Sequence, residues 1–202
     1  MQCAKLNVTK YHIDQSVKDA FEVGPVPTLE AVLTHRDHRI QFQQQLVSLY
    51  PDAVLIALKV NMPGPVKNNE LIQTLLELGI ERLHAALSAA ALETLYTKTV
   101  NAITGIEYFI VVNTSQIDFV KKLTIQLEDQ NALGRLYDFD VYNSNGSLSR
   151  EDLGYDGRRC LICNESSKAC GRNRTHTVKA LHKAMQDILI KEGSVTFNDE
   201  TR

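Results

Sequence analysis

The sequence has no run of apolar residues long enough to cross a membrane. Its longest runs, at residues 53–60 and 106–112, have the length of strands. Residues 1–19 also lack the continuous hydrophobic stretch that a secretory signal peptide requires. Both absences predict a cytoplasmic protein with no membrane contact. Because thiols stay reduced in that compartment, the four cysteines are expected as free thiols or metal ligands rather than as disulfides.

The sequence also lacks an excess of either charge. Its 22 lysines and arginines and its 24 aspartates and glutamates give a formal net charge of −2. A general nucleic-acid binder would be basic overall, so the composition argues against nucleic acid as a partner. The chain has no internal repeat or low-complexity tract. A length of 202 residues with 44% hydrophobic residues fits one domain with an appendage.

What the sequence does contain is an alternation of helical and strand patterns. Short runs rich in apolar, β-branched and aromatic residues predict strands, and longer runs with apolar residues near helical spacing predict helices. The expected order is a helix (28–50), a strand (53–60), a helix (69–92), a hairpin of two strands (94–102 and 106–113), a helix (115–130), a strand (135–142) and a last helix (177–191).

From the first strand onward this order is typical of the split β-α-β arrangement of ferredoxin-like folds. A mixed sheet of the nucleotidyltransferase type is the alternative. We therefore expect an α+β fold with helices on one face of the sheet, followed by a Cys-rich loop and a C-terminal helix. The expected parts are an N-terminal extension (1–26), an α+β core (27–150), and a basic, cysteine-containing loop with a helix packed on that core (151–202).

Two aspartates stand two residues apart in the last strand of the expected core. Side chains at that spacing project from the same face of a strand, so Asp138 and Asp140 are expected side by side. Two close carboxylates repel each other unless a cation lies between them. Mg²⁺ prefers a few carboxylates together with phosphate oxygens, which is the arrangement that nucleotidyl transfer requires. The other interpretation is a solvated strand face, and the pair taken alone favours it.

The segment "VNMPGPVKNN" (60–69) follows the first predicted strand and leads into a helix. Exposed backbone amides around Gly64 and the charge of Lys67 are suited to binding phosphate. A plain connection between strand and helix is the alternative, and the segment taken alone favours that alternative.

Three cysteines and a histidine lie close together near the C-terminus, with the spacing C-x2-C-x6-C-x5-H. The four residues are Cys160, Cys163, Cys170 and His176. Three thiolates and an imidazole satisfy tetrahedral Zn²⁺, so we expect a closed structural site. Free cysteines in a loop are the alternative.

The same part of the chain is basic. Residues 158–183 contain seven lysines and arginines and a single acidic residue, Glu165. In a chain with a slightly negative net charge this segment forms a local positive region. It is suited to binding polyphosphate or an acidic protein, and a solvated surface is the alternative.

Five stretches of the sequence occur in one order: "HRDHRIQFQQQL", "NMPGPVKN", "GRLYDFDV", "SREDLG" and "RRCLICNESSKACGRNRTH". Together they resemble the apo-citrate lyase phosphoribosyl-dephospho-CoA transferases, also called holo-citrate lyase synthases. The resemblance covers about residues 27–190 and leaves out the first 26 residues. A related transferase of malonate decarboxylase shares the paired aspartates but is not obviously tied to the cysteines, which favours the citrate lyase branch.

The resemblance implies a nucleotidyltransferase. The expected reaction joins triphosphoribosyl-dephospho-CoA through a phosphodiester to a serine of the citrate lyase acyl carrier protein (gamma) subunit and releases pyrophosphate. Because the nucleophile belongs to the partner, the enzyme itself needs a metal ion, a phosphate-binding site and a docking surface.

The residue patterns and the resemblance together suggest roles for individual side chains. Asp138 and Asp140 are expected to hold Mg²⁺ and to carry the catalysis. Four residues are expected to bind the phosphates of the donor: Gly64, Lys67, Arg135 and Arg150. Three residues of the first matching stretch have open roles, in substrate contact, packing or the surface: Arg36, Arg39 and Gln43.

The competing function is a zinc-containing, non-catalytic module that binds RNA or protein through the basic cysteine segment. It accounts for the cysteines but gives Asp138 and Asp140 no purpose. A second alternative is nucleotidyl transfer to a small molecule.

Overall fold

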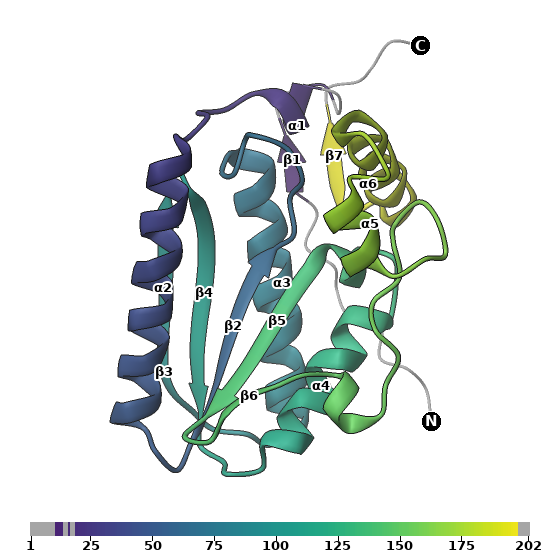
Figure 1. The fold of residues 1–202 in the computed structure, drawn as a ribbon. Coiled ribbons are helices and arrows are strands. Elements are labelled where there is room, and N and C mark those ends of the chain that lie inside the picture. Colours follow the sequence, from purple (N-terminus) through teal and green to yellow (C-terminus); the bar gives the residue numbers. More distant parts are fainter. Residues whose placement is uncertain (1–10, 14–15, 17–18, 198–202) are drawn as a thin grey trace.

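The computed structural model describes residues 11–13, 16 and 19–197, and a five-stranded antiparallel sheet lies at its centre (Figure 1). The strands lie in the order β3 (Thr94–Ala102), β4 (Gly105–Val112), β2 (Val54–Val60), β5 (Tyr137–Asn143) and β6 (Gly146–Leu148). Every neighbouring pair is antiparallel. The expected α+β class and the expected hairpin of β3 and β4 are confirmed.

Strand β2 is central because nearly all of it is apolar. Val54, Ile56 and Leu58 belong to the larger hydrophobic core, whereas Leu55 and Ala57 belong to a smaller core on the other face of the sheet. A strand that is buried on both faces requires such a continuous apolar run. The one charged residue of the strand, Lys59, lies at the candidate site.

Helices cover both faces of the sheet. α3 (Glu70–Ala89) and α4 (Ile117–Asp129) pack on the larger core, and α2 (Leu29–Leu49) packs on the smaller one through Leu46 and Phe42 (Figure 1). The expectation that helices lie on one face only is therefore wrong. The physical reason is the apolar strip of the smaller core, which includes Phe109 and Val111 and is removed from water by α2.

Capping side chains mark where two of these helices begin. Thr28 accepts a hydrogen bond from the backbone N–H of Ala31 at 3.2 Å, and Asn69 accepts one from Ile72 at 3.0 Å. Each bond satisfies one of the N–H groups that the first turn of a helix leaves unpaired. The predicted starts of α2 and α3 are confirmed within a residue or two.

The two ends of the described chain meet in a second, two-stranded parallel sheet of β1 (Tyr11–Ile13) and β7 (Val195–Phe197). The short helix α1 (Asp19–Glu22) follows β1, and Ile13 and Phe21 are buried in the larger core. The described part of the expected N-terminal extension therefore packs on the core. Residues 1–10 of that extension, including Cys3, lie outside the described residues.

The C-terminal region contains two helices. α5 (Ser167–Asn173) is a short helix within the expected Cys-rich loop, and α6 (Val178–Glu192) is the expected last helix, with Thr177 as its N-cap. Two 3-10 helices, η1 (Leu133–Leu136) and η2 (Glu151–Leu153), flank β5 and β6 in the sequence. Within the described parts of the chain, no helix combines the length and the apolar character needed to span a membrane.

The turn that leads into β5 leaves no room for a side chain at Gly134. A Cβ atom at this position would lie 2.7 Å from the carbonyl oxygen of Glu128 and would also meet the carbonyl oxygen of Leu127. Both carbonyls belong to the last turn of α4, so the absence of a side chain lets α4 and η1 approach each other closely.

Gly134→Ala is expected to lower the free energy of unfolding by about 3 kcal/mol, the upper part of the usual range for overpacked sites, because backbone atoms cannot rotate aside. Chemical denaturation of the purified protein measures this loss. The control is Gly171→Ala in α5, where a Cβ would meet no atom within 4 Å. The control should not lower the free energy of unfolding, since alanine is more favourable than glycine in a helix by about 1 kcal/mol. Equal losses in the two variants would contradict the packing argument.

Candidate active site

Asp138 and Asp140 project from the face of β5 opposite to the larger core. The side chains between and beside them, Tyr137, Phe139 and Val141, are buried in that core, whereas the two carboxylate side chains are 32% and 36% exposed. Lys59 faces Asp138 across the β2–β5 ladder. Its Nζ lies 2.9 Å from Oδ2 of Asp138 and 3.6 Å from Oδ2 of Asp140. One cation therefore contacts both carboxylates.

The two carboxyl groups differ in their electrostatic surroundings. Burial raises the pKa of Asp138, but the charge and hydrogen bond of Lys59 and the charge of Arg158 outweigh it, so the pKa lies below its usual value. Burial, followed by the charge of Asp138, raises the pKa of Asp140 above its usual value. Asp138 is thus held as an anion, while the negative charge of Asp140 is less favourable.

Two side chains of α4 hold the outer edge of β5 between the aspartates. Lys121 donates a hydrogen bond from Nζ to the carbonyl of Phe139 at 2.9 Å, and Oε1 of Glu128 accepts one from the N–H of Phe139 at 3.1 Å. Strand β6 pairs with β5 only from Val141 onward, so these side chains replace the missing ladder partner. Both are buried, and burial lowers the pKa of Lys121.

The motifs of the sequence did not point to these two α4 residues. A signal for them was present, because Lys121 and Glu128 stand seven residues apart and therefore lie on the same face of a helix. That face also carries the buried Thr124 and Ile125, so two charged residues among them indicate buried partners.

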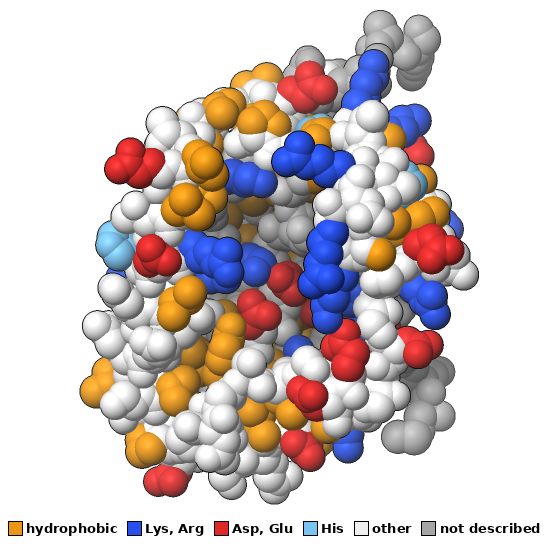
Figure 2. Space-filling view, viewed as in Figure 1, with side chains coloured by type: hydrophobic (Ala, Val, Ile, Leu, Met, Phe, Trp, Pro, Cys, Tyr) orange, Lys and Arg blue, Asp and Glu red, His pale blue; other side chains and the backbone are white. Residues whose placement is uncertain are grey.

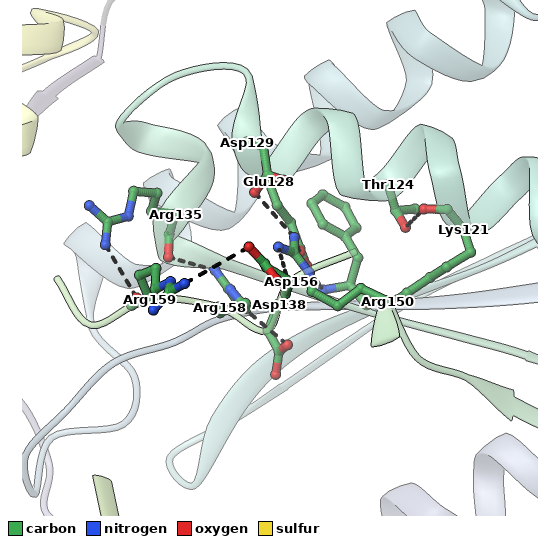
Figure 3. A network of polar contacts seen from close by, with 11 residues as sticks. Lys121, Thr124, Glu128, Asp129, Arg135, Asp138, Arg150, Asp156, Arg158 and Arg159 are labelled. Atoms are coloured by element: carbon green, nitrogen blue, oxygen red, sulfur yellow. Dashed lines mark hydrogen bonds and ion pairs between the residues drawn. The ribbon is translucent and has the colours of Figure 1, made fainter. Parts of the chain in front are cut away.

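Arg150 and Arg135 lie near the aspartates but already have partners in the protein. Nη2 of Arg150 lies 2.6 Å from Oε2 of Glu128 and 3.1 Å from Oδ1 of Asp129 (Figure 3). Arg135 donates to the carbonyl of Cys160 at 2.7 Å, and to that of the preceding residue at 3.3 Å. Arg150 thus ties the segment after β6 to α4, and Arg135 ties the cysteine segment to η1.

Arg158 connects the cysteine segment directly to the aspartates. Its Nη1 lies 3.6 Å from Oδ1 of Asp138, and its Nη2 donates to the carbonyl of Arg135 at 2.8 Å (Figure 3). Arg158 belongs to the basic segment of the sequence, and its pattern there predicted no site for this residue. Its place beside Asp138 makes it a second cation at the carboxylate pair, together with Lys59.

The loop between β2 and α3 packs against α6 instead of the aspartates. Gly64 has a φ of 95°, and a Cβ there would lie 2.9 Å from Cγ1 of Val178. The His182 ring nitrogen Nε2 lies 2.9 Å from the carbonyl oxygen of Pro63. Lys67 donates to the carbonyl of Met62 at 3.2 Å within its own loop, and burial lowers its pKa.

The three α2 residues with open roles separate in the structure. Arg36 is exposed, whereas Gln43 is buried. Arg39 faces the sheet, where its Nη1 lies 3.0 Å from Oε1 of Glu107 on β4. Its charge is also close enough to oppose the rise in the pKa of Asp140. Arg39 therefore lies close to Asp140, Gln43 is buried beneath α2, and Arg36 belongs to the surface.

The three cysteines and the histidine form one compact group that could hold a metal ion, with one ligand atom from each residue within 4.8 Å of the others. The Sγ atoms of Cys163 and Cys170 lie 3.4 Å apart, and Nε2 of His176 lies 3.2 Å from Sγ of Cys163. Sulfur atoms about 2.3 Å from a tetrahedral ion lie at similar separations. The backbone N–H of Ile162 also points at Sγ of Cys160, at 3.5 Å, which favours a thiolate.

Figure 2 shows that this face of the molecule is hollowed near its centre. Acidic side chains lie in the hollow, and lysine and arginine side chains lie on both sides of it. The arrangement suits an anionic substrate that meets carboxylates only through a cation.

Comparisons with known proteins agree with this chemistry. The model of the family described as apo-citrate lyase phosphoribosyl-dephospho-CoA transferase matches residues 27–192. A Streptococcus pyogenes protein named "Probable apo-citrate lyase phosphoribosyl-dephospho-CoA transferase" is 31% identical over 91% of this chain and 98% of its own length. A Vibrio cholerae protein of the same name is 28% identical over 80% of this chain and 90% of its own length.

A further relative is longer. "Protein CitXG" of Leuconostoc mesenteroides subsp. cremoris is 34% identical over 79% of this chain, and the match spans about a third (34%) of that protein's length. The family match covers most of the chain, and it includes the β2–α3 loop, the paired aspartates and the cysteine group. The resemblance of the five sequence stretches is thereby confirmed, and the chain belongs to the apo-citrate lyase phosphoribosyl-dephospho-CoA transferase family.

Proposed function

We propose that this chain is a cytoplasmic nucleotidyltransferase that attaches the prosthetic group of citrate lyase. It transfers the prosthetic group from triphosphoribosyl-dephospho-CoA to a serine of the acyl carrier protein (gamma) subunit, forms a phosphodiester and releases pyrophosphate. The observation that carries the proposal is the pair Asp138 and Asp140, which share one cation, in a chain that belongs to this transferase family.

The two alternative functions fit these observations less well. A non-catalytic zinc module would not need Asp138 and Asp140 to lie together at the cost of their mutual repulsion. A transferase acting on a small molecule shares the chemistry but not the acceptor that the family description names. The ferredoxin-like arrangement remains part of the proposal, supported by the β3-β4-β2-β5 strand order and the helices between the strands.

Mg²⁺ fits the carboxylate pair. One ammonium group already contacts an oxygen of each aspartate, so a single cation is within reach of both. Two carboxylates with free positions for phosphate oxygens form the donor set that Mg²⁺ prefers. When bound, the ion neutralises charge on the phosphate under attack and on the leaving pyrophosphate. Asp138 and Asp140 hold and orient it.

The cations of the chain complete the phosphate site. Lys59 and Arg158 lie at the carboxylate pair and are placed to meet the negative charge of the donor. Arg135 and Arg150 add positive charge beside the carboxylate pair. Arg135 also binds the backbone carbonyl of Cys160, and Arg150 pairs with Glu128 and Asp129. Gly64 and Lys67 contribute to phosphate binding from the loop between β2 and α3. The absence of a side chain at Gly64 lets this loop approach α6.

The cysteine group is proposed as a structural Zn²⁺ site. Cys160, Cys163, Cys170 and His176 fill a tetrahedral shell and leave no position for substrate. Such a site stabilises the polypeptide that carries it, because metal binding is coupled to folding. In this proposal residues 151–202 form a part that packs on the catalytic core of residues 27–150, and the metal gives its loop a fixed shape.

Asp138→Asn and Asp140→Asn are each expected to lower transfer activity by about 100-fold or more, because a metal clamp contributes several kcal/mol to the transition state. The assay is the mass increase of apo acyl carrier protein after addition of the donor and Mg²⁺. Asp118→Asn, at an exposed position in the first turn of α4, is the matched control and should keep wild-type activity. Wild-type turnover in either site variant at saturating Mg²⁺ would rule out the metal-holding role.

Protein purified under reducing, chelator-free conditions is expected to contain one zinc per chain by elemental analysis. Cys163→Ser should lose most of this zinc and unfold at a lower temperature, since the shell then lacks a thiolate. Cys3→Ser, which changes the cysteine outside residues 160–176, should keep both the zinc and the unfolding temperature. A wild-type preparation without stoichiometric zinc would contradict the structural site and leave the aspartate proposal untouched.

A further inference from the structure

A cavity of about 1330 Å³ lies between the cysteine segment and the core. Its walls come from the β2–α3 loop, the end of α4, the segment of residues 155–164, α5, and the start of α6. Ligand sites for drug-sized molecules occupy about 300–1000 Å³, so this cavity suits a larger ligand. We call it the arginine cavity, after five residues in its lining: Arg135, Arg150, Arg158, Arg159 and Arg174.

The lining of the arginine cavity has a surplus of positive charge. Its three acidic residues are Glu128 and Asp129, which both pair with Arg150, and Asp156, whose carboxylate lies 3.9 Å from Arg159. Three lining arginines remain without a carboxylate partner in the cavity. They are Arg135, Arg158 and Arg174. Such guanidinium groups favour an anionic ligand, and phosphate is the anion that matches their fork of donors.

A second part of the lining is apolar or aromatic. Tyr155, Ile162 and Val178 are 41–43% exposed, although they are large apolar side chains, and Leu161 and Leu181 lie beside them in the lining. Exposed apolar groups next to cations suit a ligand that joins a phosphorylated part to a base or an extended organic arm. A nucleotide with a long organic substituent has this composition.

Arg158 joins the arginine cavity to the carboxylate pair. It lines the cavity and also lies 3.6 Å from Asp138. A ligand whose phosphates meet Arg158 therefore has them next to Asp138, where the proposed reaction takes place. Neither aspartate lines the cavity itself, so the binding site and the reaction site adjoin each other without coinciding.

We propose that the arginine cavity binds the dephospho-CoA part of the donor, with the metal-binding group forming one of its walls. All four residues of that group line the cavity: Cys160, Cys163, Cys170 and His176. This inference rests on the proposed function, because it takes the donor from it. The donor then enters between the core and the cysteine segment, and the face of β5 that carries the aspartates stays open for the serine of the carrier protein.

The test is calorimetric titration of the full-length protein, with its zinc, using dephospho-CoA as the probe. Arg174→Gln is expected to weaken binding at least tenfold, because it removes a guanidinium from the lining while glutamine keeps most of the side-chain length. Arg172→Gln is the matched control: Arg172 is exposed on α5, two residues away, and does not line the cavity. It should change the affinity less than twofold.

Three results would overturn the assignment of the cavity. The first is no binding of dephospho-CoA to the wild type. The second is that the Arg174→Gln and Arg172→Gln variants bind dephospho-CoA with equal affinity. The third is that Arg174→Gln weakens only the binding of apo carrier protein. The last result would make the cavity a docking site for the carrier protein. A parallel transfer assay with the complete donor separates the two proposals. If the wild type transfers the group but Arg174→Gln binds dephospho-CoA as tightly as the wild type, only the assignment of the cavity is rejected. If Arg174→Gln weakens dephospho-CoA binding but the wild type transfers nothing, only the proposed function is rejected.

Discussion

Two carboxylates held close together on one strand are the constraint around which the rest of the site is arranged. Two unit charges 4 Å apart interact by about 4 kcal/mol near a protein surface, and partial exposure reduces this value. Burial disfavours the anion of Asp138, but the charges of Lys59 and Arg158 outweigh burial and keep Asp138 ionised. Burial, followed by the charge of Asp138, disfavours the anion of Asp140. A divalent ion would relieve the repulsion between the two carboxylates, and this supports the proposal that the pair holds a metal ion beside phosphate.

The proposed role of the pair requires a fixed β5 backbone, which side chains of α4 hold together with the sheet. Strand β2 supports one edge of β5, but β6 is short and leaves Phe139 without a strand partner on the other edge. Lys121 and Glu128 supply the missing hydrogen bonds from α4, and Arg150 neutralises Glu128 at 2.6 Å. A buried lysine and glutamate, costly on their own, are therefore part of the support for the aspartates.

Local patterns in the sequence were enough to predict most elements of the core and the shared face of Asp138 and Asp140, because strand and helix periodicities depend on neighbouring residues. They could not predict contacts between distant segments. The pairing of β1 with β7 joins residues more than 180 positions apart, and the place of α2 depends on an apolar strip built from two strands. The partners of Arg150 lay beyond local patterns for the same reason, since Glu128 and Asp129 stand 21–22 residues away in the sequence.

A short chain of contacts links the cysteine group to the carboxylates. Asp138 contacts Arg158, Arg158 donates to the carbonyl of Arg135, and Arg135 donates back to the carbonyl of Cys160 at 2.7 Å. Arg158 and Cys160 are two residues apart, so a shell that fixes Cys160 also restricts where Arg158 can lie. In the proposed function the cysteines take no part in the chemistry but would still influence it, because a metal shell around Cys160 would hold Arg158 beside the strand that carries the aspartates. This connection explains why one chain carries both features within forty residues of each other.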